Sequence, residues 1–418
     1  MTFRLYRFRW VVSLVGVIAL VVAASACGSS SASTAGAAPK HLGSPITVMA
    51  TAPINSPAVS LPQWIDAAKI YAQAVNAKGG WDGHQVKIVG CDNQVIPTVM
   101  LNCARQAASV HAVAMTGFAI PSAAVMETLQ SENIPWVNGD AVTSIELQSP
   151  MSFPINVSAV YQSSAEAALA TKDKCKATTV LASSLDEANG TLEVQQLKAQ
   201  GLKASLDVVP STATDLSPYL AQASGSSCLL LYSITEALLA SMNTALPTSG
   251  LKFQHIILTP TLTNAIIAEA PSVWNGTQIG SVDTNILAPA WAPYRQAIAR
   301  YATVSNAKFP FSEAQPVWSS MVLIGNVVTY LLKHGHSNVT SANVVTALRS
   351  NHTWSLDNTA PPVNFTKSIG IPQAPRITSP DATFWIVANG AIASEYGGKY
   401  YSILPIILNK KATGGFLG

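Results

Sequence analysis

Four cysteines in the body of the chain are suited to covalent chemistry. They are an even set without a Cys-x-x-Cys spacing, and no nearby histidine suggests a metal site, so disulfides are the favoured interpretation. Cys91 is expected to end a strand, and Cys103 to lie early in the next helix. Cys175 and Cys228 each stand just before an apolar, strand-like run. We therefore predict the pairs Cys91–Cys103 and Cys175–Cys228, with buried free thiols as the alternative.

Motifs of common enzyme classes are missing from the sequence, including the Gly-x-Ser-x-Gly elbow, His-Glu-x-x-His and the phosphate loop. The pair His334-Gly335-His336 follows an apolar helix, where histidine complements the helix dipole and glycine turns the chain. Asp186-Glu187 is expected to face solvent. We therefore expect no catalytic residue, no metal and no cofactor.

The loop 117–124 has the form of a ligand site. An apolar strand ends at Gly117, the chain turns, and Ser122 begins a helix. In open parallel sheets ligands bind beyond the carboxyl ends of the strands, where helix N-termini present free N–H groups. The alternative is a serine that only caps its helix.

Alternating strands and helices must position this loop. From Ser44 to Asn138 the pattern is βαβαβαβ, and a second series of similar size runs from Tyr161 to Thr259. Such alternation with short connections predicts an α/β fold, with parallel sheets flanked by helices. The similar lengths of the two series suggest two Rossmann-like lobes that arose by duplication.

Composition excludes several classes of protein. The chain has 418 residues, of which 49% are hydrophobic and 11% charged, so it is neither disordered nor a small disulfide scaffold. Arg4, Arg7 and Arg9 are the bases of the first 26 residues, and without them basic and acidic residues balance. A nucleic-acid partner is therefore not expected.

The N-terminus reads as an export signal. Its arginines precede an apolar run from Trp10 to Ala26 that stops at Cys27. The stretch Ala24-Ser25-Ala26-Cys27 resembles the lipobox of bacterial lipoproteins, whose cysteine becomes lipidated. Residues 1–26 are then a signal peptide, and the small polar residues of 27–43 form a flexible tether. An uncleaved membrane helix is the alternative.

A longer motif carries a family resemblance. Residues 75–84, Val-Asn-Ala-Lys-Gly-Gly-Trp-Asp-Gly-His, run into a strand that ends in Asp92-Asn93-Gln94. This resembles the signature of type I periplasmic binding proteins, in the leucine/isoleucine/valine-binding branch of ABC importers. Thr214-Asp215-Leu216-Ser217 and Asn189-Gly190 resemble weaker motifs of that family.

The resemblance implies a hinged trap. It places three crossovers between lobes near residues 157, 287 and 376. The N-terminal lobe then comprises 44–157 with 287–376, and the C-terminal lobe 158–286 with 377–418. It also implies that a main-chain and hydroxyl pocket grips the ligand, and the residues expected to bind are Ala119, Ser122, Ala123, Asn138, Asp140, Ala141, Asn189, Tyr232 and Thr261.

Asn189 and Thr261 depart from the family pattern, where tyrosine and an acid stand, so the ligand can be an amide or small carboxylate as well as an amino acid. The expected function is a monomeric, lipid-anchored solute-binding protein outside the bacterial cell membrane, which delivers its ligand to an ABC permease. A sensor partner of a signalling receptor is the first alternative. A surface hydrolase that uses Ser122 or Ser56 is the second.

Overall fold

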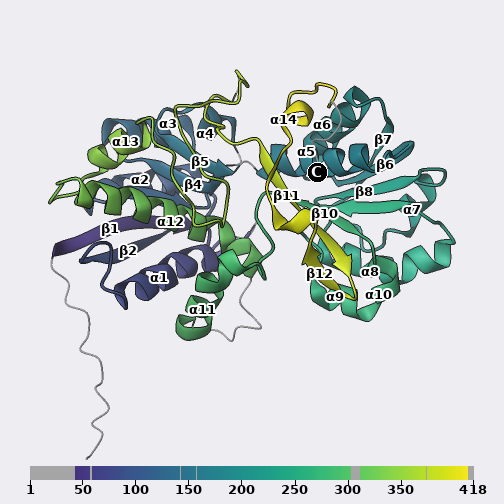
Figure 1. Cartoon of the computed structure of the whole chain (residues 1–418), viewed down its shortest axis with the longest axis horizontal. Helices are drawn as coiled ribbons and strands as arrows, with labels where there is room; N and C mark the ends of the chain where they lie inside the picture. Colours follow the sequence, from purple (N-terminus) through teal and green to yellow (C-terminus); the bar gives the residue numbers. More distant parts are fainter. Residues whose placement is uncertain are drawn as a thin grey trace, which may run out of the picture. The chain divides into compact units, whose positions relative to one another are not determined.

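The structure is a computed structural model that describes residues 43–56, 59–141, 143–156, 158–302, 311–372 and 374–412. The predicted signal peptide, Cys27 and most of the tether lie outside these residues. Two β-sheets, each with its own helices, organise the described chain (Figure 1). We call them the first half and the second half.

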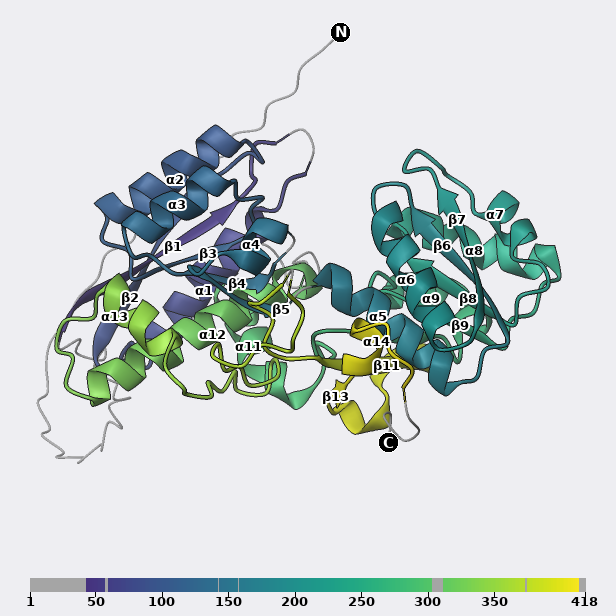
Figure 2. The ribbon, with the colours of Figure 1, turned by 90° about the horizontal axis from the view of Figure 1, so that it is seen from above.

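The first half contains a parallel five-stranded sheet in the order β2-β1-β3-β4-β5. Its strands are β1 (Gly43–Ala52), β2 (His84–Asp92), β3 (Ala114–Gly117), β4 (Trp136–Asp140) and β5 (Ser152–Asn156). Its helices are α1 (Pro62–Asn76), α2 (Pro97–Ser109), α3 (Ala123–Ser131), α4 (Ser144–Gln148), α11 (Ala292–Tyr301), α12 (Phe311–Lys333) and α13 (Ser341–Leu348). Figure 2 shows α2 and α3 on one face of the sheet, with α1 and α12 on the other.

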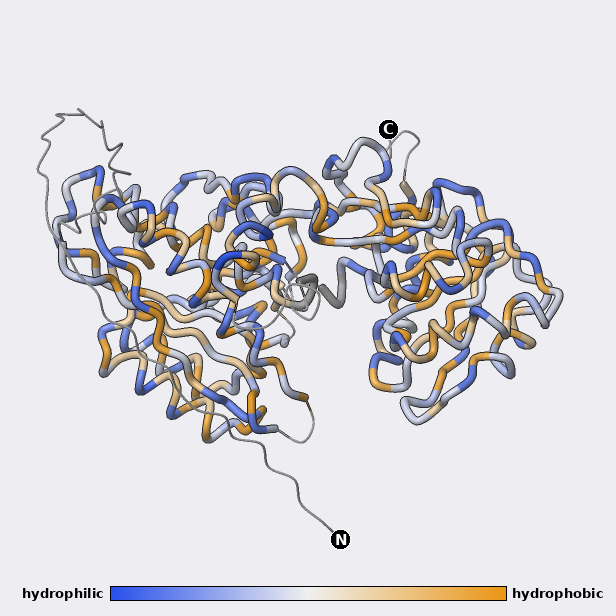
Figure 3. Tube along the Cα trace, turned by 90° about the horizontal axis from the view of Figure 1, so that it is seen from below, coloured by the Kyte–Doolittle hydropathy of each residue, from blue (hydrophilic) through white to orange (hydrophobic). Residues whose placement is uncertain are grey.

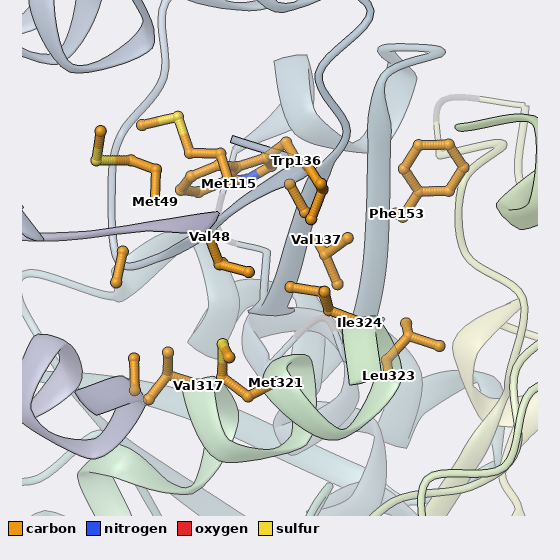
Figure 4. Close-up of a cluster of buried hydrophobic side chains, with 14 of the residues drawn as sticks. Val48, Met49, Met115, Trp136, Val137, Phe153, Val317, Met321, Leu323 and Ile324 are labelled. Atoms are coloured by element: carbon orange, nitrogen blue, oxygen red, sulfur yellow. The ribbon is translucent and has the colours of Figure 1, made fainter. Parts of the chain in front are cut away.

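Side-chain alternation along the strands builds the core of the first half, because successive residues point to opposite faces of the sheet. Met49, Met115 and Trp136 lie on one side of the strands in Figure 4. Val48 and Val137 lie on the other, toward Met321 of α12. Both faces are covered, so the strands read as continuous apolar runs.

The second half contains an eight-stranded sheet in the order β12-β11-β10-β9-β8-β6-β7, with β13 paired to β11. Its strands are β6 (Ala177–Ser183), β7 (Lys203–Val209), β8 (Cys228–Tyr232), β9 (His255–Leu258), β10 (Gln278–Ser281), β11 (Asp381–Ala388), β12 (Ala391–Ser394) and β13 (Tyr401–Ser402). Its helices are α5 (Ser158–Lys172), α6 (Glu187–Ala199), α7 (Ser217–Gln222), α8 (Glu236–Ser249), α9 (Asn264–Glu269), α10 (Pro271–Trp274) and α14 (Leu404–Ile407).

Two apolar clusters cover the two faces of this second sheet. Leu230 of β8 packs in the cluster of α5 and α6, whereas its neighbours Leu229 and Leu231 pack in the cluster of α7 to α10. Figure 3 shows the apolar segments along the strands inside each half. The alternation again follows from the twofold repeat of a strand.

The predicted α/β fold with helix-covered, mainly parallel sheets is confirmed. Strands β6 to β10 are parallel, but β11 pairs antiparallel with β10 and with β12. This edge of the second sheet is therefore antiparallel, a feature that the sequence analysis did not indicate. The reason is that β11 follows a long excursion of the chain through the first half, and it returns to the sheet in the opposite direction.

Both predicted disulfides are present. Cys91 of β2 bonds Cys103 of α2, and Cys175 bonds Cys228. The second pair forms because β6 and β8 are parallel neighbours, with Thr178 opposite Cys228, so the residue pair at their common starting edge is close. Among the described helices none is long and apolar enough to cross a membrane.

Candidate functional site

A cavity of about 360 Å³ is lined by residues of both halves. Its lining comes mostly from the carboxyl ends of strands and the starts of helices. The first half contributes Leu61, Trp64, Phe118, Gly139, Gln315 and Pro316. The second half contributes Gln162, Ser233, Thr259, Pro260, Thr261, Ser281, Val282, Asp283 and Trp385. This is where ligands bind in parallel sheets.

An aromatic pair forms the wall of the cavity in the first half. Trp64 in the first turns of α1 meets Phe118 edge to face, with ring centroids 5.6 Å apart. Asn93 fixes Phe118 in place, since its Nδ2 donates to the Phe118 carbonyl at 2.6 Å and to Thr51 Oγ1 at 3.0 Å. Thus the Asp92-Asn93-Gln94 motif positions the wall.

Asp92, the first residue of that motif, organises the loop that follows β1. Asp92 accepts hydrogen bonds from the backbone N–H of Ile54, Asn55 and Gln94 and from the Asn55 amide. Desolvation pushes the pKa of Asp92 up, but these hydrogen bonds outweigh it and lower the pKa below its ordinary value. The ionised carboxylate therefore stabilises the loop after β1 that contains Ile54 and Asn55.

Two glycines allow the strand ends to approach their neighbours. A Cβ on Gly117, whose φ is +119°, would lie 2.0 Å from the Thr51 carbonyl oxygen. A Cβ on Gly139 would lie 1.9 Å from the carbonyl oxygen of Pro316 in α12. No side chain fits at either position, so only glycine lets β3 and β4 end at the cavity as they do.

Hydroxyl groups mark the wall of the second half. Ser233 follows β8, and its hydroxyl donates to Asp186 Oδ2. Its backbone N–H donates to Thr259 Oγ1 at 3.2 Å. Trp385 of β11 adds an apolar surface from the antiparallel edge of the sheet. The wall thus combines hydrogen-bonding side chains with an indole.

The ionisable residue that lines this cavity is Asp283, which is 8% exposed. Its Oδ1 accepts a hydrogen bond from Asn156 Nδ2 at 3.2 Å, so it links the end of β5 to the end of β10. Lysine, arginine and histidine are absent from the described lining. The cavity can therefore hold a solute by apolar contact, by hydrogen bonds and by one carboxylate.

The structure places the predicted ligand residues unevenly around this cavity. Thr261 lines it. Ala119 is buried next to Phe118, and Ala123 is exposed in the first turn of α3. Ser122 caps α3, where its Oγ accepts from Val125 N at 3.4 Å. This capping role is the alternative that the sequence left open. Ser122 is also the serine considered as a hydrolase nucleophile, and its oxygen accepts this capping hydrogen bond.

The next predicted loop serves the interior of the first half. Asn138 is buried and donates to Glu146 Oε1 at 2.8 Å. The buried Glu146 also accepts from Trp136 Nε1 and from the backbone and hydroxyl of Thr143. Ala141 donates its N–H to Asn156 O at 3.0 Å. For Asp140, only the backbone belongs to the described part of the chain, and it pairs with Asn156.

Two further predicted residues lie in the second half. Asn189 is half-buried in the first turn of α6, where its N–H donates to Asp186 O at 3.0 Å. Tyr232 is buried in the core at the end of β8, one residue before Ser233. Their role in binding, like that of the other predicted residues, stays a prediction.

Sequence reasoning missed most of the lining, including Trp64, Gln162, Asp283, Gln315 and Trp385. Trp64 had a signal, because it stands in the first turns of a helix that follows the first strand, where ligand sites form. Trp385 had none, since its strand joins the sheet from a distant part of the sequence.

A buried pair of acids was also missed. Glu166 of α5 and Glu193 of α6 are both fully buried, and their carboxyl oxygens have no hydrogen-bond partner within the described part of the chain. Burial, together with the charge of Glu193, raises the pKa of Glu166 well above its ordinary value, and burial raises that of Glu193 likewise. Burial therefore favours the protonated form of both carboxyls. The sequence signal was a lone acid inside an alanine-rich helix.

The histidine pair has the structural role expected for it. His334 Nδ1 lies 2.7 Å from the Tyr330 carbonyl oxygen at the end of α12, and its ring stacks on Tyr330. Gly335 follows in the left-handed region, with φ of +91°. Within the described ranges no three His, Cys, Asp or Glu side chains gather as metal ligands.

Comparisons with solved structures give the fold. A leucine binding protein from Thermotoga maritima superposes with a TM-score of 0.58 at 12% identity, covering 85% of this chain and 99% of that one. A branched-chain amino acid transporter substrate binding protein from Streptococcus pneumoniae, in complex with isoleucine, gives 0.59 at 14%, covering 84% and 98%. A fatty acid ABC transporter substrate-binding protein from Thermomonospora curvata gives 0.62 at 13%, covering 91% and 97%.

At these identities the likeness establishes the fold alone, which is that of type I periplasmic binding proteins. No match is found among curated proteins. Residues 45–375 match the sequence model of the periplasmic binding protein family, a stretch that contains most of both halves. Since that match spans well over half of the chain, the protein belongs to the periplasmic binding protein family.

Proposed function

We propose that this protein is the extracytoplasmic substrate-binding component of an ABC importer. It captures a small solute in the cavity described above and delivers it to a membrane permease. The observation that carries the proposal is a cavity of about 360 Å³ whose lining comes from the strand ends of both halves. Solutes of up to drug size occupy cavities of this order.

The family and the fold neighbours support the role. The family is one of binding proteins. One neighbour is described as a leucine binding protein, and two as transporter substrate-binding proteins, one in complex with isoleucine and one for fatty acids. These neighbours differ in the chemistry of their ligands. The fold therefore supports solute capture, and the choice of solute depends on the residues of this chain.

Capture proceeds by hinge closure between two lobes, 44–157 with 287–376 and 158–286 with 377–418. The chain crosses between them near residues 157, 287 and 376. In this scheme the ligand binds the closed state more tightly than the open state, and the difference in affinity drives closure. The bond from Asn156 to Asp283 joins residues next to two of these crossovers.

Anchoring and assembly complete the proposal. The protein acts as a monomer, held to the outer face of the cell membrane through a lipid on Cys27 and a tether up to residue 43. Mass spectrometry of the intact protein from the native membrane tests this point. A diacylglycerol-modified Cys27 at the N-terminus supports it, and a retained residue 1 contradicts it.

Solute binding is tested by thermal unfolding with a panel of amino acids, amides, amines and organic acids, after small molecules released from the purified protein have been identified. A ligand at about 100 times its Kd adds about 2.7 kcal/mol to the stability of the folded state. Thr261→Trp fills the cavity and should abolish the shift. Thr244→Trp, an exposed position on α8, is the matched control and should keep it. If no member of the panel shifts the melting temperature, the proposal fails.

A further inference from the structure

The ionisable groups around the cavity are acids. A second cavity of about 180 Å³ adjoins the first, and the two share Pro260, Thr261, Gln315 and Trp385. Asp283 lines the first cavity and Glu236, in the first turn of α8, lines the second. The described lining of the two cavities includes no lysine, arginine or histidine. A bound carboxylate would face like charge here.

A third acid stands behind the wall. Asp186 accepts the hydrogen bond of the Ser233 hydroxyl, and Ser233 lines the first cavity. Because the Ser233 hydroxyl donates its proton to Asp186, its oxygen is left to act as an acceptor toward a ligand. Arg295 of α11 donates instead to the carbonyl oxygens of Ile286 and Ala288. Main-chain oxygens thus engage its guanidinium group.

Two of the side chains that the resemblance assigns to the ligand hydrogen-bond within the first half. The Ser122 hydroxyl accepts from Val125 N, and the Asn138 amide donates to Glu146. Neither residue lines the cavity. What the first half offers a ligand is the Trp64–Phe118 pair, and the second half adds Trp385. Aromatic faces attract cations and apolar bodies, and they do not attract carboxylates.

From these contacts we infer that the cavity selects a small organic amine, with an apolar or aromatic body against the Trp64–Phe118 pair and a cationic nitrogen toward Asp283. This inference rests on the proposed function and names its substrate class. It differs from the carboxylate or amino acid that the resemblance implies, because those ligands carry a negative charge that no cation in the described lining balances.

Three probes that share a phenylethyl group test the inference by isothermal titration calorimetry at pH 7. They are phenethylamine, 2-phenylethanol and 3-phenylpropanoate. They differ mainly in charge. We expect the amine to bind about tenfold more tightly than the alcohol, and the acid to bind more weakly than both, since an opposite charge at a partly buried site is favoured and a like charge is penalised. Leucine and isoleucine are included as the ligands of the fold neighbours.

Variants assign the preference to the acids. Asp283→Asn should bring the amine and the alcohol to within about threefold of each other. Glu236 is exposed, so Glu236→Gln should leave the fold intact. This variant should reduce the ratio of amine affinity to alcohol affinity by a smaller factor. Glu127→Gln removes one acid from the exposed face of α3, away from both cavities, and should leave the ratio unchanged.

The outcomes separate the inference from the function. Tighter binding of 3-phenylpropanoate than of phenethylamine, or an amine-to-alcohol ratio that both cavity variants leave intact, overturns the amine preference while solute binding stands. Binding of leucine without binding of any phenyl probe does the same. Only the absence of binding by every compound counts against both.

Discussion

The two halves share an architecture and differ in what they bury. In the first half, the contact between α1 and α12 is built from aromatic rings, with Tyr71 meeting Trp318 edge to face at 5.0 Å. In the second half, the contact between α5 and α6 contains Glu166, Glu193 and a hydrogen bond from Gln196 to Ser164. The comparison teaches that the pattern of covered strands defines this fold, whereas the helix contacts tolerate unlike chemistry.

The halves also differ in the direction in which the pKa values of their carboxyl groups are shifted. Burial raises the pKa of Glu166, Glu193, Asp381 and Glu395 in the second half. In the first half the shifted carboxyl is Asp92, whose hydrogen bonds lower its pKa. The exposed Asp215 is an exception in the second half, with its pKa lowered by bonds from Ser217. The carboxyls with raised pKa values therefore lower stability as the pH rises, whereas Asp92 lowers stability as the pH falls.

The disulfides give the largest expected difference between the halves. Cys175–Cys228 spans 53 residues and Cys91–Cys103 spans 12. In the chain-entropy model, closing these loops contributes about 4 and about 3 kcal/mol. Replacing both cysteines of a pair by serine should destabilise the protein by these amounts, as measured by urea unfolding. Equal losses for the two pairs would contradict the loop-length argument.

The acid pair of the second half comes next in size. Its carboxyls keep a proton in the folded state that the unfolded chain loses above about pH 4.3. The stability they allow is thus complete below that pH and falls as the pH rises, by up to about 1.4 kcal/mol per unit for each retained proton. Glu193→Gln should flatten this fall and stabilise the protein by about 2 kcal/mol at pH 8.

Urea unfolding at pH 5, 6.5 and 8 measures that effect. Glu187→Gln, an exposed acid in the first turn of the same helix, is the matched control and should keep the slope of the parent protein. A Glu193→Gln variant that is less stable than the parent at pH 8 would show that burial of these carboxyls does not destabilise the folded state at that pH.

The smallest effect belongs to Asp92 and has the opposite sign. Its folded-state pKa is lowered, so its contribution is present above about pH 4 and is lost as the pH falls through the folded value. Asp92 is half-buried and solvent still reaches it, so Asp92→Asn should cost less than about 1 kcal/mol at pH 7. The backbone amides of Ile54 and Asn55 donate to Asp92, so their hydrogen exchange should become faster in the variant. Unchanged exchange would show that the carboxylate does not stabilise this loop.

Much of the fold could be predicted from the sequence, because alternating apolar runs and helical spacing determine the strands from Ile46 to Thr259. The disulfides followed from the same register. The site could be placed only by its loops: Phe118 and Gly139 lie beside predicted residues, whereas Trp385 reaches the cavity through an antiparallel strand that no local pattern indicates. The Glu166–Glu193 contact depends on how two helices pack, which is a tertiary property.

The close approach of Gly139 to Pro316 has a mechanical consequence. Helix α12 touches the floor of the cavity through its own backbone, and its 23 residues make a rod about 34 Å long. Pro316 itself lines the cavity, so a bound solute lies against α12 directly, and a dye attached near the stacked rings of Tyr330 and His334 at the other end of the helix would report whether binding moves it.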